Sequence, residues 1–230
     1  MKLRALSFDL DGTLVDTVGE IAVAANATLA SVGLAPRPEA EIRGLIGDGM
    51  QVLMQRLLAL ARAQPHAAAL PPDAELVARF GRHYEPLLGS ASTPYPGAHA
   101  ALAALRAHGL RLACVTNKEL RFARRLLERH RFDAAFELVV GGDSLPQRKP
   151  HAAVLRHVAA GLGVPPAALA HVGDSAVDVA AARAAGVRAW AVPYGYNAGR
   201  PIADAQPDAI FADLAAVARA AIVAAKAPGG

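Results

Sequence analysis

The sequence predicts an α/β protein with a Rossmann-like, doubly wound parallel sheet and an inserted all-helical cap domain. From Pro96 onward, short apolar segments alternate with helical patterns, which is typical of a parallel sheet covered by helices on both faces. A similar apolar segment stands alone near the N-terminus, at residues 3–8. The residues between them, 15–92, show helical patterns and no convincing strand.

The predicted sheet consists of short apolar segments bounded by turn or polar residues. The expected strands are residues 3–8, 110–116, 136–140, 168–173 and 188–192. Helical patterns predict helices at 97–108, 119–130, 151–162 and 176–185. Three of these helices are expected to end at a glycine, because glycine readily takes the left-handed conformation that follows many helices. These glycines are Gly109, Gly163 and Gly186.

The separating segment predicts helices near 17–32, 39–43, 50–63 and 73–88, interrupted at Pro36, Pro38, Pro71 and Pro72. We therefore assign residues 1–14 and 93–230 to an α/β catalytic core domain and residues 15–92 to a helical cap domain. Both borders are loop-like, so a hinge is expected there. The C-terminal "APGG" is expected to be a frayed end.

Length and composition indicate a globular enzyme-sized protein. The chain has 230 residues, of which 53% are hydrophobic and 19% charged, so it can bury a sizeable core. No signal-peptide pattern and no apolar run long enough to span a bilayer are present, which predicts a cytoplasmic protein without a membrane partner. The single Cys114 allows no intrachain disulfide or zinc cluster. We expect a monomer or a homodimer.

The basic character of the chain raises nucleic acid as a partner, which we reject. The net charge is +4 and the pI about 9.6, and the densest basic stretch is residues 118–133. That stretch has the pattern of an amphipathic helix, with Phe122, Leu126 and Leu127 on one stripe. A solvated helix face explains the arginines, so we expect no nucleic-acid partner.

Polar side chains gather where the predicted strands end, and in an open parallel sheet ligands bind beyond those ends. The first strand leads into Asp9 and Asp11, which share a face because side chains two apart in a strand point the same way. Thr13 follows this pair. The other strand ends and the loops after them contribute Thr116, Asn117, Lys118, Lys149, Asp174, Ser175 and Asp178.

This set of side chains suits a divalent cation and a phosphate. Two facing carboxylates repel each other unless a cation or a shared proton neutralises them. Carboxylates bind hard cations through oxygen, whereas hydroxyl, amide and ammonium groups bind phosphate oxygens. Only four of the 24 basic side chains are lysines, yet Lys118 and Lys149 both fall in these loops, where a compact point charge is useful. The sequence therefore favours Mg²⁺ together with a phosphate-bearing substrate.

Four motifs carry a family resemblance. In chain order, "DLDGTLVDT", "VTN", "RKP" and "GDSAVD" resemble the haloacid dehalogenase superfamily of phosphohydrolases, over nearly the whole chain including the cap. The resemblance implies that Asp9 is a nucleophile that forms an aspartyl-phosphate. It also implies that Asp11 protonates the leaving oxygen and then activates water, and that Thr116 and Lys149 bind the phosphoryl group.

The same resemblance implies a Mg²⁺ site. Its ligands would be Asp9, the backbone carbonyl of Asp11, and Asp174, while Asp178 would order water around the cation. An ordinary first-turn helix acid remains an alternative for Asp178, because a carboxylate is favourable at a helix N-terminus. Thr13 and Asn117 are further candidates for phosphate binding.

Within the superfamily, "AWAVPYGYNAGRPI", "GGDSLPQRKP" and "VTNK" resemble the family of bacterial phosphoglycolate phosphatases. That resemblance implies hydrolysis of 2-phosphoglycolate to glycolate and phosphate. Glu119 and Ala152 depart from the family pattern, which usually has proline at both places. A small acidic substrate needs a cation or backbone N–H groups for its carboxylate, so Arg43 and the turn at 44–49 are candidate binding elements.

Two alternatives stay open. One is a phosphatase or mutase that acts on another small phosphate ester, such as a sugar phosphate. The other is a catalytically inactive module that binds phosphate for regulation. A phosphonoacetaldehyde hydrolase is excluded because it needs a cap lysine, and residues 15–92 contain none.

Overall fold

The computed structural model describes residues 1–62 and 70–226, and its centre is a sheet in which all pairings are parallel. The strand order is β5-β4-β1-β6-β7-β8, so the first strand of the chain lies in the middle of the sheet. The strands are β1 (Ala5–Phe8), β4 (Arg111–Val115), β5 (Leu138–Val140), β6 (Leu169–Gly173), β7 (Arg188–Ala191) and β8 (Ala209–Ile210).

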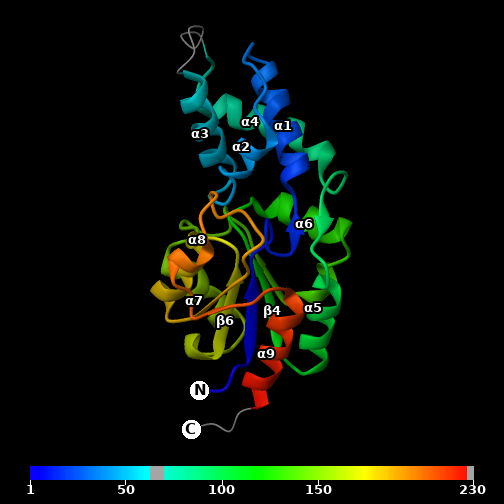
Figure 1. Ribbon diagram of the computed structural model, residues 1–230, viewed down its shortest axis with the longest axis vertical. Coiled ribbons are helices and arrows are strands. Elements are labelled where there is room, and N and C mark those ends of the chain that lie inside the picture. The colour runs from blue at the N-terminus through cyan, green and yellow to red at the C-terminus, as the bar shows by residue number, and fades with distance from the viewer. Residues whose placement is uncertain (63–69, 227–230) are drawn as a thin grey trace.

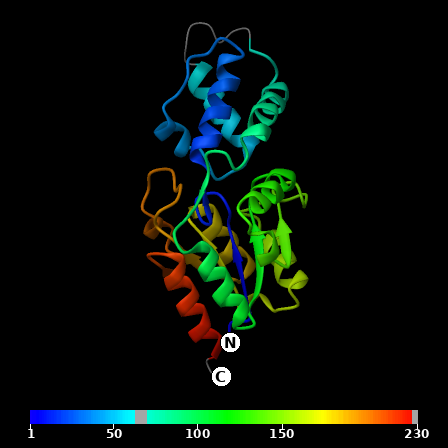
Figure 2. The ribbon, with the colours of Figure 1, turned by 90° about the vertical axis from the view of Figure 1, so that its right-hand side faces the viewer.

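Helices cover both faces of the sheet. Successive side chains of β1 point to opposite faces of the sheet. Leu6 and Phe8 therefore belong to the hydrophobic cluster on one face, and Ala5 belongs to the cluster on the other. The first cluster includes residues of α5 (Ala98–Ala107), α6 (Leu120–Arg129) and α9 (Leu214–Lys226), and the second includes residues of α7 (Ala152–Gly161) and α8 (Ala176–Ala185). Figure 1 shows α7 and α8 on one side of the strands and α5 and α9 on the other, and in Figure 2 α5 and α9 face the viewer.

The cap stands at one end of the elongated molecule, at the end opposite the chain termini (Figure 1). It contains α1 (Val18–Ala30), α2 (Glu39–Arg43), α3 (Met50–Arg62) and α4 (Asp73–Tyr84). Its apolar residues belong to the same cluster as one face of the core, so cap and core share buried surface. Glu20 of α1 is fully buried and accepts hydrogen bonds from the Tyr84 hydroxyl at 2.9 Å and the Gly89 amide at 2.9 Å.

A short antiparallel ribbon joins the two connections between cap and core. It pairs β2 (Val15–Asp16) with β3 (Thr93–Pro94). The expectation that residues 15–92 contain no strand is therefore wrong at Val15–Asp16. A two-residue strand is too short to show an alternating apolar pattern in the sequence. Its formation depends on pairing with a distant segment of the chain. The ribbon lies at the domain borders 14/15 and 92/93, and the borders themselves remain a prediction.

The main predicted elements are confirmed to within three residues at each end, apart from the last cap helix. That helix ends at Tyr84 and continues as a 3₁₀ turn. Gly109, Gly163 and Gly186 all have positive φ, as expected for helix stops. The 3₁₀ turns are η2 (Glu85–Leu87), η3 (Asp133–Ala135), η4 (Pro166–Ala168) and η5 (Ile202–Ala205).

Some features were not predicted or fall outside the description. The last elements of the core, β8 and α9, were not among the predicted strands and helices. The predicted end of the third cap helix at residue 63 and the frayed "APGG" end lie outside the described residues. Within residues 1–62 and 70–226, no helix has both the length and the apolar character needed to cross a bilayer.

Candidate active site

The candidate site forms where the three central strands end. Asp9 directly follows β1, Thr116 follows β4 and Asp174 follows β6, and these strands are neighbours in the sheet. All three side chains are at least nine-tenths buried. The turn after β1 needs Gly12, whose φ is +86° and where an added Cβ would lie 2.4 Å from Oδ2 of Asp174. The carboxyl ends of three neighbouring strands therefore meet at one site, as the sequence predicts.

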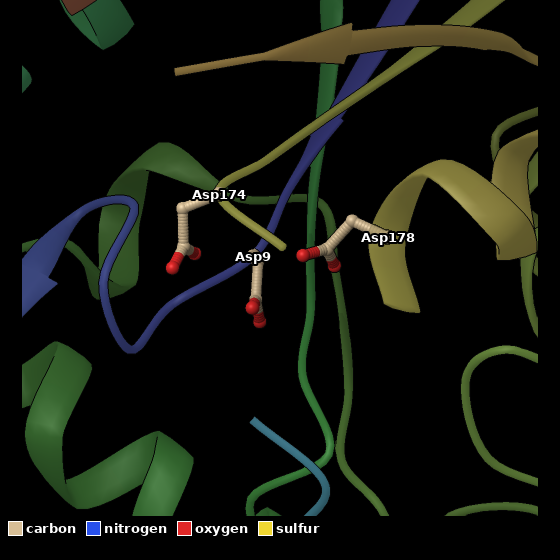
Figure 3. Close-up of side chains that lie close together, drawn as sticks. All are labelled: Asp9, Asp174 and Asp178. Atoms are coloured by element: carbon tan, nitrogen blue, oxygen red, sulfur yellow. The ribbon is translucent and has the colours of Figure 1, made fainter. Parts of the chain in front are cut away.

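Three carboxylates form a buried acidic cluster, Asp9, Asp174 and Asp178 (Figure 3). Each offers one oxygen, and these oxygens all lie within 4.8 Å of one another. Asp178 comes from the first turn of α8, where both its oxygens are in use. Its Oδ2 accepts hydrogen bonds from the Ser175 amide and hydroxyl, at 3.1 and 2.6 Å, in a capping box.

Lys149 lies beside this cluster and is only 2% exposed. Its ammonium contacts Oδ1 of Asp178 at 2.6 Å and Oδ1 of Asp9 at 3.0 Å, and donates to the Val115 carbonyl at 2.8 Å. A lysine buried without partners loses its charge readily, so these contacts favour the charged form of Lys149. Burial lowers the pKa of Lys149, but the two carboxylates more than offset this and the net pKa is raised.

The carboxyl groups respond differently to the shared burial. Burial raises the pKa of Asp9 to about 7 against the opposing effect of Lys149, and the negative charges of Asp178 and Asp11 add to the increase. Burial also raises the pKa of Asp174 well above its usual value, with further contributions from Asp178 and Asp9. Burial alone would raise the pKa of Asp178 too, but Lys149 and His171 bring it below the usual value.

The acidic cluster fits a divalent cation. If all three carboxylates are ionised, one ammonium leaves two negative charges uncompensated in a buried region, which is costly. Among the described residues, Asp174 has no cationic partner; it accepts hydrogen bonds from the Thr13 hydroxyl at 2.7 Å and the Tyr196 amide at 2.6 Å. Carboxylate oxygens are the donors that hard cations prefer. Asp9 and Asp174 are the better placed ligands, because Asp178 already has its own partners.

Asp11 is paired with Lys118, and both residues line the cavity described below. The Lys118 ammonium lies 2.9 and 2.8 Å from the two oxygens of Asp11, and the Thr17 hydroxyl donates to the same carboxylate at 2.7 Å. From the sequence, Lys118 was one of two lysines in strand-end loops that suit a phosphate site, but it was not named among the binding residues. Thr13, predicted to bind phosphate, is fully buried and its hydroxyl is directed at Asp174.

Two other predicted site residues have different surroundings from those expected. The Asn117 amide group donates to the carbonyls of Gly47 at 3.1 Å and Lys149 at 3.0 Å, so it fastens a cap loop to the core. Arg43 lies 3.6 Å from Asp16 and over the Tyr196 ring, 5.2 Å from its centroid. It is not among the residues that line the cavity described next.

A cavity of about 50 Å³ lies between the core and the cap, above Asp9. Since one water needs about 10–15 Å³ of such volume, the cavity suits a small ligand rather than a large one. Its polar wall comes from the core and its apolar wall mostly from the cap. The lining residues are Asp9, Asp11, Ile21, Ile46, Gly47, Gly49, Met50, Leu53, Phe80, Tyr84, Thr116, Asn117, Lys118, Glu119 and Phe122.

A buried histidine supports the cluster from inside the sheet. His171 of β6 lies opposite Ser7 of β1 in the strand register, and its Nδ1 is 2.9 Å from the Ser7 hydroxyl. Its Nε2 lies 3.2 Å from Oδ1 of Asp178. Burial lowers the pKa of His171. No histidine was given a role from the sequence, although a histidine inside an otherwise apolar strand segment is a detectable signal.

The fold and the site together define an α/β protein with a buried acidic, lysine-containing site under a helical cap. The model of the haloacid dehalogenase-like hydrolase family matches residues 6–192. A phosphoglycolate phosphatase of Nitrosospira multiformis is 40% identical over 218 residues, covering 93% of both chains. One of Chromobacterium violaceum is 46% identical over 195 residues, covering 84% of this chain and 86% of the relative.

Solved structures agree with this similarity. A predicted phosphoglycolate phosphatase from Haemophilus somnus superposes with a TM-score of 0.92 at 35% identity, covering 96% of this chain and 98% of the other. CbbY from Rhodobacter sphaeroides, solved in complex with phosphate, superposes with a TM-score of 0.78 at 26% identity, covering 93% and 95%. The chain belongs to the haloacid dehalogenase-like hydrolase family, and the resemblance stated from its motifs is confirmed.

Proposed function

We propose that this protein is a Mg²⁺-dependent phosphomonoesterase that hydrolyses 2-phosphoglycolate to glycolate and phosphate. The observation that carries the reaction class is the buried Asp9 carboxylate held 3.0 Å from the Lys149 ammonium, next to Asp174 and Thr116, at the end of the central strand. The similarity to enzymes named phosphoglycolate phosphatase, over most of both chains, supports the substrate. The small cavity supports a small ester.

In the proposed reaction Asp9 attacks phosphorus. A bond forms between its carboxylate oxygen and phosphorus while the bond from phosphorus to the ester oxygen breaks, and the ester oxygen takes a proton from Asp11. Water then attacks the aspartyl-phosphate and gives its proton to Asp11, which releases phosphate and restores Asp9. Lys149 and Thr116 hold the phosphoryl oxygens during both steps.

Asp9 and Asp174 are the side chains that would hold Mg²⁺, with the Asp11 carbonyl as a third proposed ligand. When bound, the cation offsets negative charge on the phosphoryl oxygens and on the acidic cluster. Asp178 orients Lys149 through the 2.6 Å contact and would not itself hold the cation. Thr13 acts indirectly, since its hydroxyl fixes the Asp174 carboxylate.

The cap contributes by excluding water. Met50, Leu53, Phe80 and other apolar side chains roof the cavity, which strengthens the electrostatic interactions beneath them. The Gly47 carbonyl accepts a hydrogen bond from Asn117, so the cap loop is fastened at the edge of the site. The 44–49 turn named in the sequence analysis is thus part of the proposed substrate enclosure.

The direct test is phosphate release by the purified protein from 2-phosphoglycolate and a panel of sugar phosphates, with Mg²⁺ or with chelator. The proposal expects a strong preference for 2-phosphoglycolate, loss of turnover with chelator, and loss in Asp9→Asn. Metal-dependent release that prefers a sugar phosphate would overturn the substrate and favour the alternative phosphatase. Binding of esters without turnover would favour a regulatory module.

Two further proposals concern the surroundings of the protein. We infer a cytoplasmic location, which fractionation of cells expressing the tagged full chain tests. We also infer that the protein is a monomer or a homodimer, because its proposed site is built from residues of one chain. Analytical ultracentrifugation tests this, and a larger assembly would contradict it.

A further inference from the structure

We propose that Lys118 binds the carboxylate of the substrate and thereby selects a phosphorylated small acid over a neutral ester. The inference rests on the proposed phosphatase function and adds the residue that determines specificity. It replaces Arg43, the residue that the sequence favoured for this task.

The charge distribution in the cavity points to Lys118. Among the lining residues, all of which belong to the described part of the chain, it is the one with a cationic side chain. Its side chain is 7% exposed, so the ammonium is held inside the enclosure rather than in solvent. A second negative group on a substrate must find a positive partner there, since burying an unpaired carboxylate is costly.

Arg43 is engaged elsewhere. Its guanidinium lies 3.6 Å from Asp16, 3.8 Å from Glu39 and over the Tyr196 ring. Of these partners, Tyr196 belongs to a core loop, Asp16 and Glu39 lie within residues 15–92, and none of the three lines the cavity. Its side chain is 36% exposed, five times as much as that of Lys118. The structure therefore gives Arg43 a role in connecting cap and core.

The position of Lys118 matches the covalent structure of the substrate. In 2-phosphoglycolate a single carbon separates the carboxylate from the ester oxygen, so a group that protonates this oxygen must adjoin the group that binds the carboxylate. Asp11 is the proposed proton donor, and the Lys118 ammonium lies 2.8 Å from it. In a longer acid the carboxylate would lie farther from the ester oxygen, and therefore farther from Asp11.

The surroundings of Lys118 favour an exchange of partners. On one side its ammonium is 4.9 Å from the centre of the Tyr84 ring, whose hydroxyl is tied to the buried Glu20. On the other side it contacts Asp11, which keeps a separate hydrogen bond from Thr17. A substrate carboxylate can replace Asp11 as the ion-pair partner of the Lys118 ammonium, and Asp11 can then donate its proton to the ester oxygen. The apolar walls strengthen the new ion pair because they exclude water.

The test compares two substrates of similar size in the full-length protein with Mg²⁺. One is 2-phosphoglycolate and the other is ethyl phosphate, which lacks the carboxylate. The variants are Lys118→Met, Lys118→Gln and Lys118→Arg, with Arg43→Met as the matched removal of a positive charge. The measured quantity is the kcat/KM for 2-phosphoglycolate divided by the kcat/KM for ethyl phosphate. Loss of the Lys118–Asp11 ion pair affects both substrates, so its effect cancels in this ratio.

We expect Lys118→Met and Lys118→Gln to lower this ratio by about 10- to 100-fold, the loss typical of a hydrogen-bonded charged pair. The loss should appear mainly in KM for 2-phosphoglycolate, and Lys118→Arg should recover part of it. Arg43→Met should leave the ratio within about twofold, as expected for a contact that does not touch substrate. Should one neutral variant fail to fold by thermal melting, the other supplies the ratio.

The outcomes separate this inference from the proposed function. If the unaltered protein hydrolyses 2-phosphoglycolate but Lys118→Met lowers both kcat/KM values equally, the carboxylate contact is refuted and the phosphatase stands. A ratio that falls in Arg43→Met instead would return the role to Arg43. Absence of turnover of either ester by the unaltered protein would refute the proposed function itself.

Discussion

Removal of the Lys149 charge is the perturbation for which the structure gives the clearest magnitude. The ammonium is 2% exposed and is the cation between two buried carboxylates, with contacts of 3.0 Å to Asp9 and 2.6 Å to Asp178. In Lys149→Met both carboxylates lose the ammonium that compensates their charge. Breaking a buried pair in this way costs about 3–5 kcal/mol of unfolding free energy. For a chain of this length, that corresponds to a fall in Tm of roughly 6–20 °C.

The assay is urea denaturation in chelator, followed by far-UV circular dichroism. Arg125→Met is the control, because the Arg125–Glu85 pair has a similar 2.6 Å contact but is nearly half exposed on both sides. That variant should lose no more than about 1 kcal/mol. A loss below about 1 kcal/mol for Lys149→Met as well would refute the view that a buried ion pair organises the site.

Three further predictions follow from the geometry of the site. Burial raises the pKa of Asp9 to about 7. In chelator, the protonated Asp9 carboxyl therefore contributes to the free energy of unfolding at low pH, and this contribution is lost as pH rises through about 7. The increase in Tm on adding Mg²⁺ should therefore be larger at about pH 8 than at about pH 5.5, and a pH-independent increase would contradict this. Gly12→Ala should weaken Mg²⁺ binding in calorimetry by about 10- to 100-fold, because its Cβ meets the Asp174 carboxylate. Gly33→Ala, with a similar φ but nothing within 4 Å, should bind Mg²⁺ as the unaltered protein does. His171→Leu should lose about 1–3 kcal/mol in urea denaturation because it leaves buried groups unpaired, and adding Ser7→Ala should recover part of it; no recovery would argue against the hydrogen bond between them.

The fold was largely predictable because its strands and helices carry strong local signals. Strands such as Leu138–Val140 are short and apolar throughout, and glycines with positive φ end three helices. The ribbon at Val15–Asp16 was not predictable, because its pairing with Thr93–Pro94 depends on how the two connections meet in space. Strand order was also beyond the sequence reasoning, although ligand binding beyond the strand ends did not require it.

The candidate site was predictable as a set of residues but not in its contacts. Positions at predicted strand ends, together with the family resemblance, brought Asp9, Asp174 and Lys149 into one expectation, and the structure places them together. Which cationic side chain contacts which carboxylate depends on side-chain directions, and the positions of the residues in the sequence do not determine these directions. For this reason Arg43 was the favoured partner of a substrate carboxylate, while the structure directs Arg43 to Asp16 and Lys118 into the cavity.

The central claim, that Asp9 accepts the phosphoryl group of a small ester, is tested most directly by acid quenching. The protein is mixed with 2-phosphoglycolate labelled with ³²P in the presence of Mg²⁺, quenched within milliseconds and precipitated. The account predicts label bound to the unaltered protein, released by hydroxylamine as expected for an acyl phosphate, and absent from Asp9→Asn. Rapid release of labelled phosphate with no protein-bound label at any time, or equal labelling of Asp9→Asn, would contradict it.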